Sequence, residues 1–578
     1  MLEDVIKTFE KQYKKYGDKL ITDSYTPVDG EYVIVDPFNG FNIIDRENIK
    51  MDKKTREIDR SIDYFDFICE ADYMSKYLDS NKALSDKNIH SNNYMSFFVK
   101  KENVHNGKIT NEKIAKYYDI LRNPVKKYSK PNAKKLYEEI EKKYGKADEE
   151  RIDKIQEWII NNLYNLVEKD SKDKSHLKIL FKYNLEDYKK ESEKYIIPNI
   201  YNSNDYNITT NSGIYGLPND NMGLNAKKPY LENKSRKVKV PYLLTKEKVL
   251  MQKKFFDFLM NQVSIGKTNI YINDDEIFTL KNDEMPKDDF QGYYLRIKKG
   301  KEVEIHDFDT IGNYSQNIRQ FKLKNALELE KSKIEYRTIN KLSTMKDIIN
   351  EVFFSKFLTS NYFTESKDMN INDSILKKNI LLARNTLFSW FYKGNKNNVW
   401  KILNGCSLDL IKGNISNGYL FKSSDQFNLR CSLKNYFEGG DNMADILKGI
   451  KESLRAKLNE KDTPSIESDS EYYFSVGQLT SYFISLSKGK NKVHSLANPI
   501  INAKTDMRIK DELKKLYKKY NYTIKTGNIK FKNLYCMIAS YVPQGKIQED
   551  IVIAGYLNSS LIYEKKENED NNVNKEEN

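Results

Sequence analysis

The sequence has few of the residues that build disulfide frameworks and metal sites. Its four cysteines and five histidines lie far apart, and no C-x-x-C pair occurs among them. A zinc site therefore cannot be read from their spacing, and we assign neither a metal nor a cofactor. Because the chain opens on a predicted amphipathic helix and not on a signal peptide, we expect reduced thiols and a cytoplasmic location.

Long apolar runs and arginine are also scarce. No stretch approaches roughly eighteen consecutive apolar residues, so we expect no membrane span. Arginine supplies only 13 of the 97 cationic side chains. Bidentate contacts to bases or phosphates, which need the guanidinium fork, should therefore be few.

Positive charge is what the chain has in excess. Its 578 residues carry a formal net charge of +14 and a pI near 9.0. An excess of cations attracts polyanions and so favours a nucleic-acid partner. Lysine, asparagine, isoleucine and tyrosine are abundant together, however, and AT-rich codon usage alone would produce the same pattern.

Catalytic signatures are incomplete. VSIGKT (263–268) ends like a phosphate-binding loop, but Asn261 stands where the first glycine is needed, and a helix should precede the segment. HDFD brings His306, Asp307 and Asp309 together, as in a metal or acid–base site. A strand end followed by a turn explains that cluster more simply. We therefore expect a protein that is not an enzyme.

The hydrophobic pattern predicts an α+β multidomain protein, with a mixed α/β N-terminal part followed by a mostly helical C-terminal bundle. We expect a mixed α/β domain over 1–200 and a basic, β-containing, nucleic-acid-binding region over 201–345. A helical domain should follow over 346–563, with a smaller bundle from about residue 443. Residues 564–578 have almost no apolar side chains and are predicted to be a disordered tail.

Local patterns give firmer expectations within these regions. Residues 1–17 have a helical apolar face, and so has 148–168. Residues 31–45 have a strand-like composition that Pro37 and Gly40 interrupt, which predicts a hairpin.

One short stretch combines small polar side chains with a buried strand. In NIHSNNYMSFFVKK (88–101), His90, Ser91, Asn92 and Asn93 lead into an apolar run that ends at Lys100 and Lys101. An asparagine amide offers a donor and an acceptor together, so Asn92 and Asn93 suit the reading of base edges if the strand holds them at an exposed mouth. The alternative is that they cap the turn before the strand, which asparagine and serine also do well.

A second stretch concentrates cations. Between residues 227 and 239 the only acid is Glu232, and Pro229 and Tyr230 stiffen the start. An extended basic arm of this kind suits a phosphate backbone, although a solvated strand face gives the same pattern. Its cations are Lys227, Lys228, Lys234, Arg236, Lys237 and Lys239.

Five ordered stretches together resemble the large subunit of the type I-B CRISPR Cascade complex, the Cas-eight-b family. They span most of the chain, from about residue 70 to 563. The stretches are YMSKYLDSNKALSDKNIHSNNYMSFFVKKEN followed by ITNEKIAKYYDILRNP, then LNAKKPYLENKSRKVKVPYLL, NYFEGGDNMADILKGIKESLRAKL, YYFSVGQLTSYFISLSKGKNKVHSLANPIINAK and IVIAGYLNSSLIY.

The resemblance implies a non-catalytic subunit of an RNA-guided surveillance complex. Such a subunit recognises the protospacer-adjacent motif on double-stranded DNA, stabilises the opened DNA and recruits a separate helicase-nuclease. Guide RNA and the other Cascade subunits, both backbone-repeat and guide-handle subunits, are its expected partners. Pairing with the guide reads the sequence, so the protein needs to read only a short motif and the backbone.

Two details of the resemblance concern particular residues. Some relatives carry a C-x-x-C-G zinc motif, but the nearest segment here, NSGIYG (211–216), has no cysteine. The family often makes a separate small subunit from an internal start, and Met443 heads a predicted amphipathic helix after Gly439 and Gly440. Met443 is equally suited to being an ordinary first residue of that helix.

Two other functions stay open at this point. One is a stand-alone, metal-dependent nuclease or phosphohydrolase that uses His306, Asp307 and Asp309. The other is a purely structural subunit whose lysines meet only RNA and protein.

Overall fold

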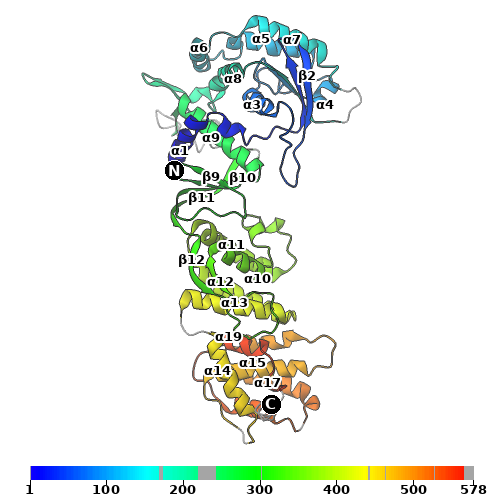
Figure 1. Cartoon of the computed structure of the whole chain (residues 1–578), viewed down its shortest axis with the longest axis vertical. Helices are drawn as coiled ribbons and strands as arrows, with labels where there is room; N and C mark the ends of the chain where they lie inside the picture. The colour runs from blue at the N-terminus through cyan, green and yellow to red at the C-terminus, as the bar shows by residue number, and fades with distance from the viewer. Residues whose placement is uncertain are drawn as a thin grey trace, which may run out of the picture. The chain divides into compact units, whose positions relative to one another are not determined.

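The computed structural model describes residues 2–167, 173–218, 242–300, 302–439, 443–461, 464–525 and 527–564. It contains 51% helix and 15% strand, with an α/β N-terminal region and a helical C-terminal region (Figure 1). The expected α+β multidomain class is therefore confirmed. The predicted disordered tail lies, from residue 565 onward, outside the described residues.

The chain divides into two compact units. The first unit comprises Met1–Glu284 and Gln291–Thr310, and the second comprises Met285–Phe290 and Ile311–Asn578. This division differs from the three regions expected from the sequence, because residues 201–345 are shared between both units. The chain passes from one unit to the other within the strand β10 (Phe290–Lys299) and again within the strand β11 (Val303–Tyr314).

A four-stranded mixed sheet is central to the first unit. Its strand order is β2 (Asn42–Ile49), β1 (Gly30–Asp36), β4 (His176–Phe181) and β3 (Ser96–Lys100). β1 and β4 run parallel, whereas β2 and β3 are antiparallel to their neighbours. β1 and β2 form the hairpin expected over 31–45. The two central strands, GEYVIVD and HLKILF, are buried along almost their whole length, as their runs of apolar residues indicate.

Helices cover both faces of this sheet. Successive strand residues point to opposite faces, and Phe97 of β3 packs on Tyr117 and Tyr118 of α5 (Asn111–Arg122). On the other face Lys178 of β4 meets Asp72 of α3 (Phe65–Ser75). The hydrophobic core around the sheet also takes in α7 (Glu149–Asn162), which fulfils the helix expected there, and α8 (Leu185–Asn199).

A second sheet and two helices complete the core of the first unit. The sheet has the order β11, β10, β8 (Asn269–Ile272) and β9 (Ile277–Leu280). α1 (Leu2–Tyr16), which confirms the first predicted helix, packs with α9 (Lys246–Ser264) against it. VSIGKT joins α9 to β8, so its order is helix then strand, the reverse of a phosphate-binding loop.

Smaller elements lie around these two sheets. NSGIYG forms a turn and the middle strand of a three-stranded sheet, where backbone pairing on both sides holds it. The smaller elements of the first unit are α2 (Lys19–Thr22), α4 (Lys101–His105), α6 (Pro131–Tyr144), β5 (Ile208–Thr210), β6 (Gly213–Gly216) and β7 (Leu244–Thr245).

The second unit is a helical assembly with one two-stranded sheet, β12 (Asn317–Lys322) and β13 (Thr338–Lys341). Its helices in chain order are α10 (Leu342–Val352), α11 (Ser374–Lys393), α12 (Val399–Ser416), α13 (Leu420–Glu438), α14 (Met443–Leu458), α15 (Asp469–Ser485), α16 (Asn498–Ile501), α17 (Asp506–Tyr520), α18 (Ile529–Ser540) and α19 (Glu549–Leu557).

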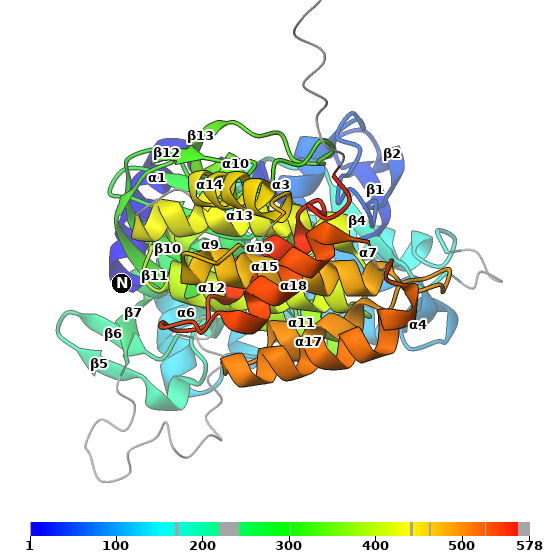
Figure 2. The ribbon, with the colours of Figure 1, turned by 90° about the horizontal axis from the view of Figure 1, so that it is seen from below.

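The helix α15 is buried along nearly its whole length and packs against α14, α17, α18 and α19 (Figure 2). Its closest neighbour is α19. A Cβ atom at Gly477 would collide with the carbonyl of Val552, and one at Gly555 would collide with the carbonyl of Phe474. The two glycines therefore permit a backbone approach that no other residue allows. None of the helices in the described ranges is long and apolar enough to cross a membrane.

Candidate functional site

The stretch 88–101 folds against the edge of the first sheet. Ile89 forms a bridge with Val99, and the amide of His90 donates to the carbonyl of Phe98 at 2.8 Å. Ser91 bridges to Lys76 at the end of α3. The polar residues of this stretch therefore lie between β3 and α3 and are not a free loop.

The two asparagines of this stretch are buried, with exposed fractions of 1% for Asn92 and 0% for Asn93. The expectation of an exposed mouth is wrong for both. Asn92 donates to the carbonyl of Lys76 at 2.9 Å. Asn93 donates to the carbonyl of Tyr188 at 3.1 Å and accepts from the amide of Met95 at 3.1 Å. The capping alternative thus describes Asn93, whose amide satisfies backbone groups at the turn.

Two further members of the predicted set also have partners inside the fold. Ser91 is buried, and its hydroxyl lies 2.9 Å from that of Tyr117. The ammonium of Lys101 lies 2.8 Å from both Glu31 and Asp173, and its side chain is 12% exposed. Neither of these side chains faces an external ligand in this conformation.

His90 and Lys100 remain as candidates. His90 lines a cavity of about 290 Å³. Lys100 is 42% exposed, and its nearest carboxylate, Glu102, lies 3.9 Å away.

The strand register explains why cations gather at this cavity. In the antiparallel pair, Lys100 lies opposite His176 and Phe98 lies opposite Lys178. Residues two apart on a strand share a face, so all four belong to the same side of the sheet. Lys178 and His176 therefore face the cavity from a strand whose other side is core.

The described lining of the cavity contains cations and no acid. Lys76 comes from the end of α3 and Lys299 from β10, and the rings of Tyr25, Tyr77 and Phe98 fill the space between the polar groups. None of the described residues that line the cavity is acidic. Its titratable lining, apart from the tyrosines, consists of Lys76, His90, His176, Lys178 and Lys299.

The two histidines face each other across this space. Their ring centroids are 5.5 Å apart, and the His90 ring also meets the edge of Tyr77 at 5.3 Å. Burial lowers the pKa of His90 to about 4, and His176 and Lys100 add to that effect. Burial likewise lowers the pKa of His176, followed by the charges of Lys178 and Lys100. Both imidazoles are therefore neutral near pH 7.

The lysines of the cavity differ in how their charge is balanced. Lys178 forms a buried ion pair with Asp72 at 2.5 Å and lies over the ring of Phe98 at 4.9 Å. The ammonium of Lys76 lies over the rings of Tyr25 at 4.9 Å and Tyr73 at 5.4 Å. In the described part of the chain no carboxylate forms an ion pair with Lys76. Burial, the largest influence, lowers its pKa.

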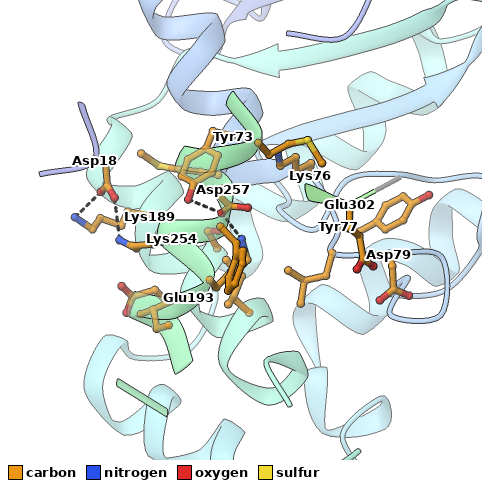
Figure 3. A pocket seen from close by; sticks show the side chains of 18 of the residues that line it. Asp18, Tyr73, Lys76, Tyr77, Asp79, Lys189, Glu193, Lys254, Asp257 and Glu302 are labelled. Carbon is orange, nitrogen blue, oxygen red and sulfur yellow. Dashed lines mark hydrogen bonds and ion pairs between the residues drawn. The ribbon is translucent and has the colours of Figure 1, made fainter. Parts of the chain in front are cut away.

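A second cavity, of about 310 Å³, shares Lys76 and Tyr77 with the first, and its lining contains ion pairs (Figure 3). Asp18 pairs with Lys189 at 2.9 Å and Lys254 at 2.8 Å. Although burial alone would raise the pKa of Asp18, these lysines lower it to about 2. Asp257 accepts from Lys253 and Tyr73 in the same way. This network links elements of the first unit. The whole lining holds five acids against four lysines, so this cavity, unlike the first, does not favour an anion.

The HDFD cluster does not converge. His306, Asp307 and Asp309 lie on β11, where alternation points the histidine to one face and the two aspartates to the other. His306 lies 3.3 Å from Glu304. Within the described ranges, no group of three or more metal-binding side chains comes together.

The basic arm is not described. Lys227, Lys228, Lys234, Arg236, Lys237 and Lys239 all fall within 219–241, outside the described residues. Their role stays a prediction.

Sequence reasoning missed His176, Lys178, Lys76 and Lys299. One signal was present in HLKILF, where a histidine and a lysine alternate into an otherwise apolar strand. Charged groups on one face of a central strand indicate a face that is not ordinary core. The contribution of α3 and β10 depends on tertiary packing and has no such signal.

Comparison of the chain with protein-family models, curated proteins and solved structures finds no match in any of the three. Residues and geometry therefore carry the functional conclusion, with the resemblance of the five ordered stretches beside them.

Proposed function

We propose that this chain is the non-catalytic large subunit of a type I-B CRISPR RNA-guided surveillance complex, acting in the cytoplasm. In that role it recognises the protospacer-adjacent motif on duplex DNA, stabilises the opened DNA and recruits the helicase-nuclease. The observation that carries the proposal is the cavity of the first unit. Its cationic lining contains no acid and is built on the stretch with which the resemblance begins.

The charges of the cavity support a contact with the nucleic-acid backbone more than with base edges. Ammonium groups and imidazoles bind phosphates, and such contacts position a protein without reading sequence. Asn92 and Asn93 support the turn that carries His90. Because both asparagines are buried, we do not assign the reading of bases to them. The basic arm between Lys227 and Lys239 is the candidate for tracking the strand.

The helical second unit supports the part of the proposal that concerns opened DNA and the small subunit. α14 begins at Met443, so a product of an internal start there would begin on a complete helix. The hydrophobic core around α14, however, also includes Ile411, Ile415 and Phe427 from the helices before Met443. A separate small subunit would have to cover that apolar surface with another protein.

Co-expression of the chain with its neighbouring genes and a guide RNA tests the proposal. We expect it to co-purify with guide RNA and other subunits, and the complex to bind motif-bearing duplex DNA in preference to a matched duplex without the motif. Failure to co-purify with RNA contradicts the proposal. Equal binding of both duplexes would instead support a purely structural subunit.

The same preparation distinguishes the remaining alternative. Metal-dependent cleavage of DNA by the purified chain, lost in Asp307→Ala, would indicate a nuclease.

Reversing the charge of Lys237 and Lys239 should weaken the binding of all DNA sequences alike and flatten the salt dependence of that binding. Mass spectrometry of the complex should detect a fragment that begins at Met443 if the internal start is used.

A further inference from the structure

The cavity of the first unit combines two unusual features. It gathers three lysines without an acidic lining residue, and it places two neutral histidines 5.5 Å apart at its wall. We propose that this cavity binds one phosphate group of a nucleic-acid strand, and that binding adds a proton to the pair formed by His90 and His176. The identity of the strand rests on the proposed function, whereas the phosphate chemistry rests on the cavity alone.

The balance of charge favours an anion. Lys178 is neutralised by Asp72 at 2.5 Å. Lys76 and Lys299 form no ion pair with a carboxylate in the part of the chain that the structure describes, although the buried carboxylates of Asp257 and Asp72 act on Lys76 from farther away. The described lining itself holds cations and no acid, so it carries an excess of positive charge. A divalent cation would meet these ammonium groups and no carboxylate, which makes this lining a poor metal site.

The setting of each imidazole explains the coupling to a proton. The carbonyl of Lys87 beside His90 and the carbonyl of Asp29 beside His176 favour the protonated rings, but burial and the surrounding cations outweigh them. An anion in the cavity screens those cations and accepts from an imidazolium N–H. The bound anion therefore favours a protonated imidazole. Because proton binding and phosphate binding are linked, the phosphate binds more tightly at a pH low enough for an imidazole to be protonated.

The groups that face the pair come from every element around it. β3 supplies Lys100, β4 supplies Lys178 and β10 supplies Lys299. From α3 come Lys76, at its end, and Asp72, whose charge favours the protonated form of His176. Because the two rings are close, the first proton repels a second, so we expect an uptake of about one proton per phosphate.

A short oligothymidylate is the suitable probe for the full-length chain. Neither its phosphodiesters nor its thymines titrate between about pH 6 and about pH 8, so any proton taken up belongs to the protein. Calorimetric titration in two buffers of different ionisation heat counts that proton. We expect roughly tenfold tighter binding at about pH 6 than at about pH 8. Equal affinity at both pH values, or no proton uptake, overturns the proposal.

Variants place the effect at the cavity. His90→Gln combined with His176→Gln should bind without pH dependence, whereas His494→Gln, a half-buried imidazole of the second unit, should behave as the parent. Lys299→Gln should weaken binding, and Lys298→Gln, which points to the opposite face of β10, should not. Identical behaviour of Lys299→Gln and Lys298→Gln contradicts the assignment, and both positions are exposed, so neither variant threatens folding.

The unsubstituted chain provides a measurement that does not depend on variants. With histidine labelled selectively, two of the five imidazoles should shift when oligothymidylate is added. No shift in any imidazole excludes the site. Inorganic phosphate separates the sources, because binding of free phosphate without binding of oligothymidylate contradicts a strand-borne phosphate.

The two proposals fail separately. If oligothymidylate binds with proton uptake but no guide RNA co-purifies, the cavity stands and the CRISPR assignment falls. If the complex assembles on guide RNA but takes up no proton, only the cavity proposal is overturned.

Discussion

The two units of the chain bury positive charge in different ways. In the second unit Lys457 lies 2.9 Å from Glu471, and Arg430 lies 3.0 Å from Asp550, with all four side chains largely buried. In the first unit Lys178 has a partner of this kind, but Lys76 beside it forms no ion pair among the described residues. Its ammonium lies over aromatic rings, and the carboxylates of Asp257 and Asp72 act on it only from farther away. Both units therefore hold buried cations in ion pairs, and the first unit in addition leaves Lys76 without an ion pair beside a cavity.

This difference separates structure from function. A buried ion pair is costly to break, because removal of one partner leaves an uncompensated charge. A buried cation without an ion pair makes the folded protein less stable. Such a loss of stability is expected at a binding site, because the ligand then supplies the negative charge. The matched pairs hold helices together, and the unmatched lysine indicates a site.

Lys457→Met tests the matched side of this comparison and should have the largest effect. It leaves the Glu471 carboxylate buried at 4% exposure with only Ser453 and a backbone amide as donors. We expect the free energy of unfolding of the second unit to fall by about 3–5 kcal/mol. Chemical denaturation measures it, with Lys448→Met, exposed on the same helix, as the control. Equal stability of both variants would mean that the pair contributes nothing.

Asn93→Ala tests whether the predicted reading residue acts in folding. The change leaves the amide of Met95 without its side-chain acceptor in a buried turn and removes a donor to the carbonyl of Tyr188, which lies within α8. The first unit should lose about 1–3 kcal/mol of stability. Asn81→Ala, at an exposed position, is the comparison. A fully stable Asn93→Ala protein that no longer distinguishes motif DNA would restore the reading role.

Lys76→Met tests the unmatched side. Methionine keeps the packing against Tyr25 and Tyr73 and removes an ammonium that forms no ion pair among the described residues. Stability should change by less than about 1 kcal/mol, while affinity for oligothymidylate should fall by roughly tenfold. Denaturation and calorimetric titration on the same preparation measure both. A loss as large as that of Lys457→Met would show that Lys76 is a structural cation after all.

The smallest effect concerns the response of stability to acid. The pKa of His90 is lowered from 6.5 to about 4 in the folded chain, chiefly by burial, so the unfolded chain binds more protons between these values. Stability of the first unit is therefore fully present above about pH 6.5 and falls as the pH drops toward about 4. His90→Gln should flatten that decline, and His494→Gln should not. Urea denaturation over this range measures the slope, and an unchanged slope in His90→Gln would contradict the burial of this imidazole.

Much of the fold follows from local pattern. The helix at 1–17, the hairpin over 31–45 and the helix within 148–168 appear as α1, β1–β2 and α7. Each has a strong apolar period or a clear turn signal, and these signals depend on neighbours in sequence.

The site was predicted less well, because its geometry depends on distant contacts. Asn92 and Asn93 were expected to be exposed, and nothing in their own stretch shows that α3 and Tyr188 cover them. His90 was included in the predicted set, but its meeting with His176, from a strand far along the chain, follows only from the pairing of β3 with β4. Charge balance at a cavity is a property of tertiary structure and has no counterpart in sequence spacing.

The crossing of α15 and α19 has a consequence for the recognition of relatives. Gly477 and Gly555 each lie against the backbone of the other helix, so a side chain at either position would force the helices apart. A homologous chain that keeps this crossing must keep both glycines, and one that has lost either must have repacked the core of the second unit. In a chain for which whole-sequence comparison finds no match, this pair of positions is a physical fingerprint by which a distant relative can be accepted or rejected.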